Sequence, residues 1–320
     1  MESIQNQKYG LGTAALGRPQ YINVRQESNK NIDLASFKAQ GLEVLEKAYQ
    51  LGVRYFDTAP GYGLAEQLLF DWLKTKDDST IQIATKWGYT YVANFNPDAL
   101  VHEIKEHSVT KLNEQWSISK DFLPNLKVYQ IHSATLETGV LKNEAVLNRL
   151  AYLKNEFNIQ IGITTTGLNQ TEVIKKALDV TIDDKQLFDA FQVTYNILDQ
   201  SLNTIKTDLN SQNKTIILKE ALANGRLLKN HNFSHYADLY KVLEELSYKY
   251  RVGIDAIALK FCEQTINNSL VLSGASTIEH LKANLKIESF KLSNTDIEEL
   301  KDFKIKPTNY WNERKQLNWN

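Results

Sequence analysis

The chain has a single cysteine and no long apolar segment among its 320 residues. Cys262 cannot form an internal disulfide, and it lies in a stretch with helical spacing, so we interpret it as a small buried side chain. No segment reaches the roughly 18 apolar residues of a membrane-spanning helix. The first ten residues also lack the basic start and the apolar run of a signal peptide. These absences favour a cytoplasmic protein.

A charge excess of either sign is also missing. The 37 Lys and Arg residues nearly balance the 38 Asp and Glu residues, for a formal net charge of −1. No overall field would therefore draw the chain to a phosphate backbone or to an anionic lipid surface. We expect neither nucleic acid nor a membrane as a partner.

Segments typical of linkers are absent as well. No stretch is rich in Pro, Gly or Ser, and the composition does not change abruptly along the chain. The length fits either two domains of about 150 residues or one larger barrel. Because nothing marks a boundary, residues 1–320 are predicted to form one domain.

Short β-branched runs alternate with stretches of helical spacing along most of the chain, which is typical of a parallel sheet with crossover helices. The predicted strands are 53–57, 81–85, 127–131, 159–163, 188–194, 215–218, 270–272 and 286–290. Amphipathic stretches lie between them, such as the one that places Leu239, Leu243 and Leu246 on one face. Eight strands with intervening helices predict an α/β fold, a single (β/α)8 TIM barrel. The aperiodic segment from Lys306 to Asn320 is predicted to be a C-terminal loop tail.

Four side chains able to carry chemistry follow successive predicted strands. Asp57 ends the first strand, Tyr62 lies in the loop behind it, Lys86 follows the second strand and His132 the third. Active sites of such barrels lie at the carboxyl ends of the strands, so the four should converge. Singly, each residue is more simply a structural one, but jointly they favour catalysis.

These residue types suit proton transfer to a carbonyl oxygen. A phenol has an ordinary pKa near 10 and needs assistance at neutral pH. The Lys86 ammonium would stabilise the phenolate of Tyr62, and Asp57 would keep the lysine charged and in place. A neutral His132 could orient the carbonyl group.

The segments GVRYFDTAPGYGLAE, ATKWG and YQIH resemble the Asp, Tyr, Lys and His motifs of the aldo-keto reductases. IQIGITTTG, FQVTYN, LANGRL and VLSGASTIEHLKANL resemble later motifs of that family. The resemblance implies a (β/α)8 barrel with an N-terminal hairpin, which we assign to the segment from Gly12 to Arg18. It also implies NADP(H) or NAD(H) as cofactor and reversible hydride transfer to an aldehyde or ketone, or from the corresponding alcohol or sugar.

The resemblance also assigns cofactor residues. They are Thr164, Thr165 and Gln192 at the carboxamide, Lys219 beside the nicotinamide, Leu222, Asn224, Gly225 and Arg226 along the pyrophosphate, and Gly274, Ala275, Ser276, His280 and Asn284 at the adenosine end. Many family members have an aromatic ring where this chain has Lys219. Lys or Arg, which would pair a 2′-phosphate, is missing at Gly274, Ser276 and His280, so NADH is an alternative to NADPH.

Trp87 and Tyr89 follow Lys86 and are candidate walls of a substrate pocket, although aromatic residues at a strand end often belong to the core. His231 and His235 have the i,i+4 spacing of metal ligands, but no third ligand is evident, and we expect no metal. Arg226 is either a pyrophosphate contact or a solvated charge.

The sequence thus predicts an NAD(P)H-dependent oxidoreductase with Tyr62 as general acid and base. It would act on a small carbonyl or sugar substrate as a monomer or small homo-oligomer. An alternative is a nucleotide-binding regulatory module on the same barrel with low turnover, which Lys219 motivates. Another is a Schiff-base aldolase that uses Lys86.

Overall fold

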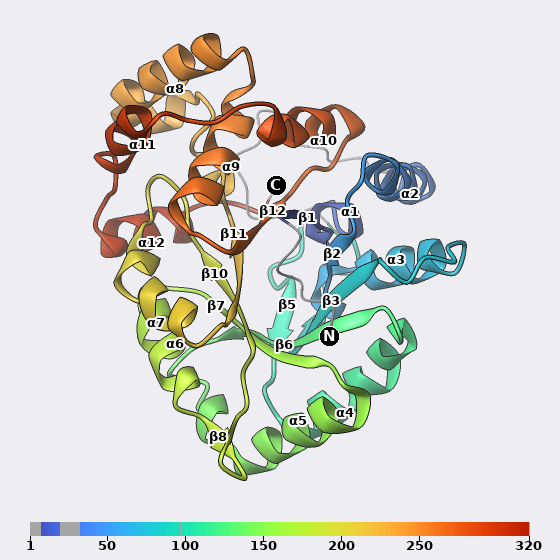
Figure 1. The fold of residues 1–320 in the computed structure, drawn as a ribbon. Coiled ribbons are helices and arrows are strands. Elements are labelled where there is room, and N and C mark those ends of the chain that lie inside the picture. The colour runs from blue at the N-terminus through green and yellow to red at the C-terminus, as the bar shows by residue number, and fades with distance from the viewer. Residues whose placement is uncertain (1–7, 20–32, 97, 320) are drawn as a thin grey trace.

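The computed structural model describes residues 8–19, 33–96 and 98–319. Eight parallel strands close into a barrel in the order β1–β12–β11–β10–β7–β6–β3–β2, and helices surround it (Figure 1). The strands are β1 (Tyr9–Gly12), β2 (Tyr55–Asp57), β3 (Gln82–Trp87), β6 (Leu126–Ala134), β7 (Gln160–Thr165), β10 (Ala190–Thr194), β11 (Thr215–Lys219) and β12 (Ser269–Ser273). The prediction of a single-domain (β/α)8 TIM barrel is confirmed.

Most helices lie between consecutive barrel strands and pack on the outside of the sheet. They are α1 (Ala14–Gly17), α2 (Leu34–Gln50), α3 (Ala65–Leu73), α4 (Val109–Ser119), α5 (Glu144–Phe157), α6 (Gln170–Leu178), α7 (Lys206–Ser211), α8 (Ala237–Tyr250), α9 (Ile254–Thr265), α10 (Ile278–Asn284), α11 (Asn294–Lys301) and α12 (Pro307–Lys315). Local sequence sets their ends. Asp33 caps α2, and Ser293 with Asp296 forms a capping box on α11.

The core has two parts. Apolar side chains between the strands and the helices form the larger one, and a smaller cluster around Tyr55 fills the barrel interior. A Cβ on Gly10 would lie 2.7 Å from Cδ1 of Tyr55. The glycine therefore makes room for this buried ring inside the barrel.

Three details of the sequence interpretation are wrong. Residues 286–290 are not a strand, because Leu285–Ser289 form a 3-10 helix that follows α10. The missing strand is β1, which pairs in parallel with β12 and β2. No hairpin closes the barrel within residues 8–19, since the segment after Gly12 forms α1. The tail is not a loop throughout, because it contains α12.

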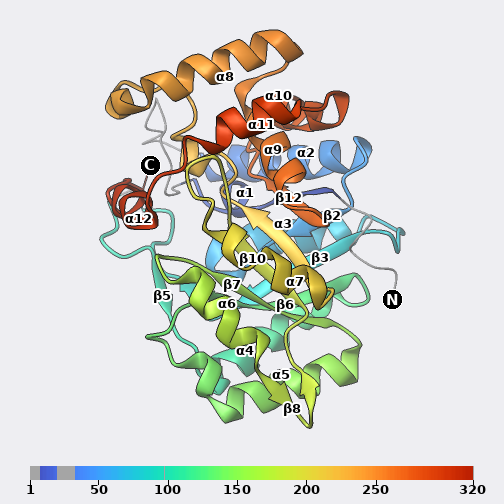
Figure 2. The ribbon, with the colours of Figure 1, turned by 60° about the vertical axis from the view of Figure 1, so that its left-hand side comes forward.

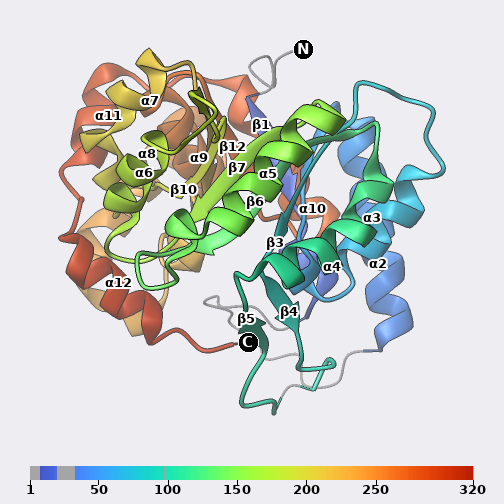
Figure 3. The same cartoon turned by 90° about the horizontal axis from the view of Figure 1, so that it is seen from below.

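One end of the barrel carries additional elements. The antiparallel pair β4 (Tyr89–Tyr91) and β5 (Glu103–Lys105) lies at the same end of the barrel as α12 (Figure 2). Seen from below, the segment after α12 runs toward β5 (Figure 3). A second short pair, β8 (Thr181–Ile182) and β9 (Lys185–Gln186), follows α6. Among the described helices, none combines the length and the apolar character needed to cross a membrane.

Candidate active site

The site is built around a buried ion pair at the carboxyl ends of β2 and β3. The Asp57 carboxylate accepts a hydrogen bond from Nζ of Lys86 through Oδ2, and Lys86 also donates to the carbonyl of Thr58 at 2.9 Å. The other carboxylate oxygen of Asp57 accepts from Gln192 at 2.7 Å and from Gln130 at 3.3 Å. A charge pair inside a barrel is stable only when its remaining hydrogen-bonding capacity is satisfied, which the two amides achieve.

Tyr62 and His132 lie beside this pair. Tyr62 is carried by the single 3-10 turn Pro60–Tyr62 directly after β2, and Nζ of Lys86 lies 4.6 Å from its ring centroid. The His132 ring meets the Tyr62 ring edge-on, with centroids 5.4 Å apart. The structure therefore brings together all four residues that the sequence suggested for catalysis.

The protonation states of these groups follow from burial and charge. Burial lowers the pKa of His132 well below its usual value, and the nearby charge of Lys86 lowers it further, so the imidazole is neutral at physiological pH. Burial raises the pKa of the Tyr62 phenol well above its usual value and Asp57 adds to the rise, whereas Arg18 opposes it. The phenol thus holds its proton in this state.

Three residues proposed to contact the cofactor carboxamide differ in what they bind. Gln192 uses its amide nitrogen on Asp57, and Thr164 accepts from the backbone N–H of Ser133 at 2.6 Å through its hydroxyl. Thr165 is fully buried, and its hydroxyl has no hydrogen-bond partner among the residues that the structure describes. Because buried hydroxyls are normally paired, this hydroxyl at the end of β7 has hydrogen-bonding capacity left for a ligand.

Lys219 ends β11 and belongs to an ionic group that reaches the C-terminal helix. Its Nζ donates to the Thr194 hydroxyl at 2.9 Å and lies 3.7 Å from a carboxylate oxygen of Glu220. Both carboxylate oxygens of Glu220 accept from Arg314 of α12, with distances between 2.6 and 3.1 Å. Arg314 and Lys219 outweigh the opposing effect of burial and set the pKa of Glu220 to about 2. α12 is thereby fixed to the mouth of the barrel.

The turn after β11 does not leave Arg226 in solvent. Its side chain is fully buried and donates to the carbonyl of Tyr310 at 3.2 Å and to the carboxylate of Glu313 at 3.1 Å. The interpretation of Arg226 as a solvated charge is therefore wrong, because this guanidinium binds α12. Leu222 is half-buried, while Asn224 and Gly225 are buried in the same turn.

The segment proposed for the adenosine end follows β12. Gly274 is exposed, and a Cβ there would meet nothing within 4 Å. Ala275 is buried, Ser276 is half-buried and the His280 ring is exposed. Asn284 accepts from the Ser273 hydroxyl at 2.8 Å and donates to Asp255 at 2.6 Å in the amide orientation that satisfies both neighbours. Positions 274, 276 and 280 themselves carry no Lys or Arg side chain.

Of the two proposed pocket aromatics, only Tyr89 faces the site. Its ring centroid lies 4.6 Å from that of His132. Trp87 is fully buried and does not face the site, because its ring packs edge-on against His107 with centroids 5.5 Å apart. Successive side chains of a strand point to opposite faces, so the residue after the inward-facing Lys86 points toward the helices.

Arg18 lies at the site although no local sequence pattern indicated it. The residue follows α1, is 3% exposed, and places its guanidinium carbon 5.4 Å from the Tyr62 ring centroid and 4.7 Å from that of Trp319. Trp319 also stacks on His102 at 4.4 Å. Recognising Tyr9–Gly12 as a strand would have placed Arg18 just beyond a carboxyl end.

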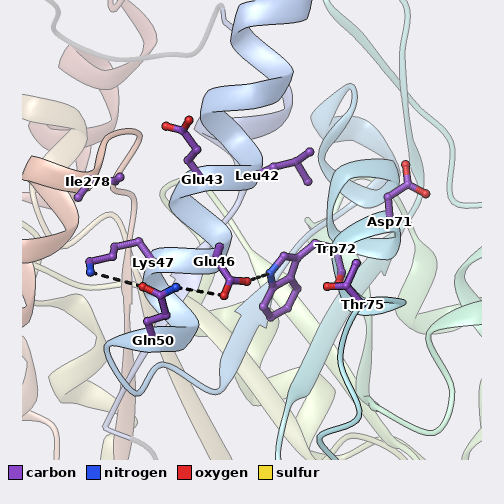
Figure 4. Close-up of a pocket in the computed structure, with 9 residues that line it drawn as sticks. All are labelled: Leu42, Glu43, Glu46, Lys47, Gln50, Asp71, Trp72, Thr75 and Ile278. Carbon is purple, nitrogen blue, oxygen red and sulfur yellow. Dashed lines mark hydrogen bonds between the residues drawn. The ribbon is translucent and has the colours of Figure 1, made fainter.

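A cavity of about 510 Å³ lies elsewhere, on the outside of the barrel. Figure 4 shows its lining by α2 and α3, with Glu46 bonded to the Trp72 indole and Ile278 contributed from α10. None of the proposed site residues lines it.

Within the described ranges there is no cluster of three His, Cys, Asp or Glu residues able to hold a metal. Of the two histidines with the spacing of metal ligands, His235 contacts the Glu313 carboxylate at 3.1 Å.

The chain is similar in sequence and in fold to known proteins. An uncharacterized oxidoreductase of Bacillus subtilis (strain 168) is 24% identical over 280 residues, covering 80% of this chain and 84% of the relative. The NADH-specific methylglyoxal reductase of Escherichia coli (strain K12) is 22% identical over 323 residues, covering 90% and 92%. The solved holo form of an aldo-keto reductase from Bacillus halodurans has a TM-score of 0.69 at 20% identity, covering 93% and 92%.

A family model extends over nearly the whole described barrel. Since the model of the Aldo/keto reductase family matches residues 9–305, the chain belongs to this family and is an NAD(P)H-dependent oxidoreductase.

Proposed function

We propose that this protein reduces an aldehyde or ketone, or oxidises the corresponding alcohol or sugar, with Tyr62 as the group that transfers the proton. The observation that carries the proposal is the position of the Tyr62 phenol ring, with Nζ of Lys86 4.6 Å from its centroid and the His132 ring 5.4 Å away. A phenol, a cation and a neutral imidazole around one point suit a carbonyl oxygen that becomes an alkoxide.

The cofactor supplies the hydride when it is bound, and several residues of this chain are suited to hold it. The unpartnered Thr165 hydroxyl would bind the carboxamide. The open backbone at Gly274 would accept the adenosine end. The absence of Lys and Arg at Gly274, Ser276 and His280 supports NADH over NADPH, as does the name of the Escherichia coli relative.

Tyr62 would donate its proton to the developing alkoxide. The Lys86 ammonium would stabilise the phenolate left behind, and Asp57 would hold that ammonium in place and charged. His132 is neutral because burial and Lys86 lower its pKa, so it can donate one N–H to the carbonyl oxygen and orient it. Tyr89, next to His132, would form one wall of the pocket.

The substrate is proposed to be a small carbonyl compound. A relative named a methylglyoxal reductase supports a 2-oxoaldehyde as the first compound to assay. A Schiff-base role for Lys86 is disfavoured, because this role requires a neutral amine and Lys86 donates to the Asp57 carboxylate. Lys219, in place of an aromatic ring, keeps the regulatory module with low turnover as the second candidate.

The test is Tyr62→Phe, with Tyr55→Phe as a matched control. The Tyr55 hydroxyl is buried and has no partner, so its removal should leave turnover of methylglyoxal near the level of the unmodified protein. Tyr62→Phe should lower turnover about 100-fold or more while NADH still quenches the intrinsic fluorescence at the same concentrations. Full turnover in Tyr62→Phe would refute the role of Tyr62, and NADH binding without turnover in the unmodified protein would favour the regulatory module.

A further inference from the structure

Arg18 is a buried cation for which the proposed chemistry has no role. Its guanidinium lies between two aromatic rings, 5.4 Å from the centroid of Tyr62 and 4.7 Å from that of Trp319. Only 3% of the residue is exposed. Burying a guanidinium costs free energy unless its surroundings use the charge, so its position beside the proposed acid requires an explanation.

The hydrogen bonds of Arg18 lead to the turn that carries Tyr62. Nη1 donates to the carbonyl of Gly61 at 3.0 Å, and Gly61 directly precedes Tyr62 in the 3-10 turn. The same nitrogen lies 2.8 Å from the Glu103 carboxylate of β5. One nitrogen of this side chain thus joins the turn that carries Tyr62 to the β4–β5 pair.

The charge of Arg18 also acts on the phenol. Within the described part of the chain, the charged groups near Tyr62 include Asp57, Lys86, Glu103, Glu220 and Arg18. The carboxylates of Asp57, Glu103 and Glu220 raise the pKa of Tyr62, and Arg18 lowers it. Lys86 also lies near the ring and donates hydrogen bonds to Asp57 and Thr58. The Trp319 ring on the other side of the guanidinium excludes water, which lengthens the reach of that charge.

We propose that Arg18 is a positioning residue for proton transfer: it holds the Tyr62 turn at the mouth of the barrel and places a second cation next to the phenol. The inference rests on the proposed role of Tyr62. It adds to the Asp, Tyr, Lys and His group a residue from the segment after β1, and it gives the C-terminal Trp319 a function as the cover of this cation.

The experiment measures the pH dependence of turnover with NADH and methylglyoxal in Arg18→Met and Arg18→Lys. A general acid must be protonated, so the rate of reduction falls as pH rises through the apparent pKa of Tyr62. Without the cation this pKa rises, and the descending limb should move about one pH unit toward alkaline values in Arg18→Met. In Arg18→Lys the charge is kept, so the limb should stay in place, while kcat falls about tenfold because the shorter ammonium side chain does not reproduce the contacts of Nη1 with Gly61 and Glu103.

A matched control is Arg54→Met. Arg54 also covers a tyrosine ring, at 4.0 Å from Tyr49, donates to a backbone carbonyl at 2.7 Å and pairs with a carboxylate at 3.3 Å, but it precedes β2 at the other end of the barrel. Its loss should leave the limb unmoved. The proposal for Arg18 would be overturned if the descending limb moved equally in Arg18→Met and Arg54→Met, or if it moved in neither.

Glu103→Gln tests the same charge with the opposite sign and keeps the Arg18 side chain. Removal of this carboxylate lowers the pKa of Tyr62, so the limb should move toward acid. The pKa of Tyr62 can also be measured without turnover, as the part of the tyrosinate absorbance titration that is lost in Tyr62→Phe. The midpoint of this titration should shift in the same direction as the limb in Arg18→Met and in Glu103→Gln. An unmoved tyrosinate titration in both Arg18→Met and Glu103→Gln refutes the Arg18 proposal alone. Full activity of Tyr62→Phe refutes the proposed function instead.

Discussion

Glu66 should make the protein less stable as pH rises through neutrality. Its carboxyl group lies on the first turn of α3, behind the strand that carries Lys86, and accepts hydrogen bonds from the Thr85 and Ser119 hydroxyls. Burial raises its pKa from 4.5 to about 7, against the lowering effect of those hydroxyls and of Lys86. The folded protein therefore holds this proton more tightly than the unfolded chain does.

The sign and size of the effect follow from linkage. A raised folded-state pKa leaves stability intact below the unfolded pKa of 4.5 and removes it as pH rises through about 7. Because a tenfold change in proton affinity corresponds to about 1.4 kcal/mol, the full loss is about 3 kcal/mol, of which about 2.5 kcal/mol develops between about pH 5 and about pH 8. Glu66→Gln has no such proton, and its amide oxygen can still accept from Thr85 and Ser119.

The assay is urea unfolding of both proteins at several pH values, followed by circular dichroism. The free energy of unfolding of Glu66→Gln, relative to that of the unmodified protein, should increase by about 2.5 kcal/mol across this range. Taking the difference removes the contributions of all other titrating groups. Parallel curves, with a constant difference at every pH, would refute the account of a carboxyl group buried against its charge.

Three further outcomes are expected. Gly17→Ala should lower both stability, by about 1–3 kcal/mol in thermal unfolding, and turnover, because its Cβ would lie 2.0 Å from the Tyr62 carbonyl oxygen. Glu220→Gln should weaken the attachment of α12 through Arg314, seen as faster proteolytic cleavage of the C-terminal segment with an unchanged cleavage rate in the rest of the chain. Gly274→Lys has open space for its side chain and should strengthen NADPH binding about tenfold in fluorescence titrations, with NADH binding unchanged.

The repeating units of the fold and the convergence of the candidate catalytic residues were predictable because their signals are local. Asp57, Lys86 and His132 follow strands of β-branched and aromatic residues, and parallel strands bring their carboxyl ends together. β1 was missed because Tyr9–Gly12 has only four residues, two of them glycines, which are poor strand formers. Residues 286–290 carry Ile287 and Phe290 three positions apart, which is helical rather than strand spacing, and Leu285–Ser289 continue α10 as a 3-10 helix.

The roles that depend on contacts across the chain could not be read from local patterns. Arg226 and Glu220 are tied to α12, which follows them by more than 80 residues. Arg18 contacts Tyr62 and Trp319. These residues are so far from Arg18 in the sequence that no short motif contains the contacts. The burial of Trp87, in contrast, could have been predicted from the sequence. Neighbouring side chains of a strand point to opposite faces, so Trp87 points away from the face that carries Lys86.

The most direct test of the central claim uses NADH that carries deuterium at the transferable position, mixed with methylglyoxal and the unmodified protein. Mass spectrometry of the alcohol product should show one deuterium on the former carbonyl carbon, with formation of this product falling about 100-fold in Tyr62→Phe and persisting in Tyr55→Phe. An unlabelled product, or a labelled one formed equally fast by Tyr62→Phe, would contradict hydride transfer to a carbonyl that Tyr62 protonates.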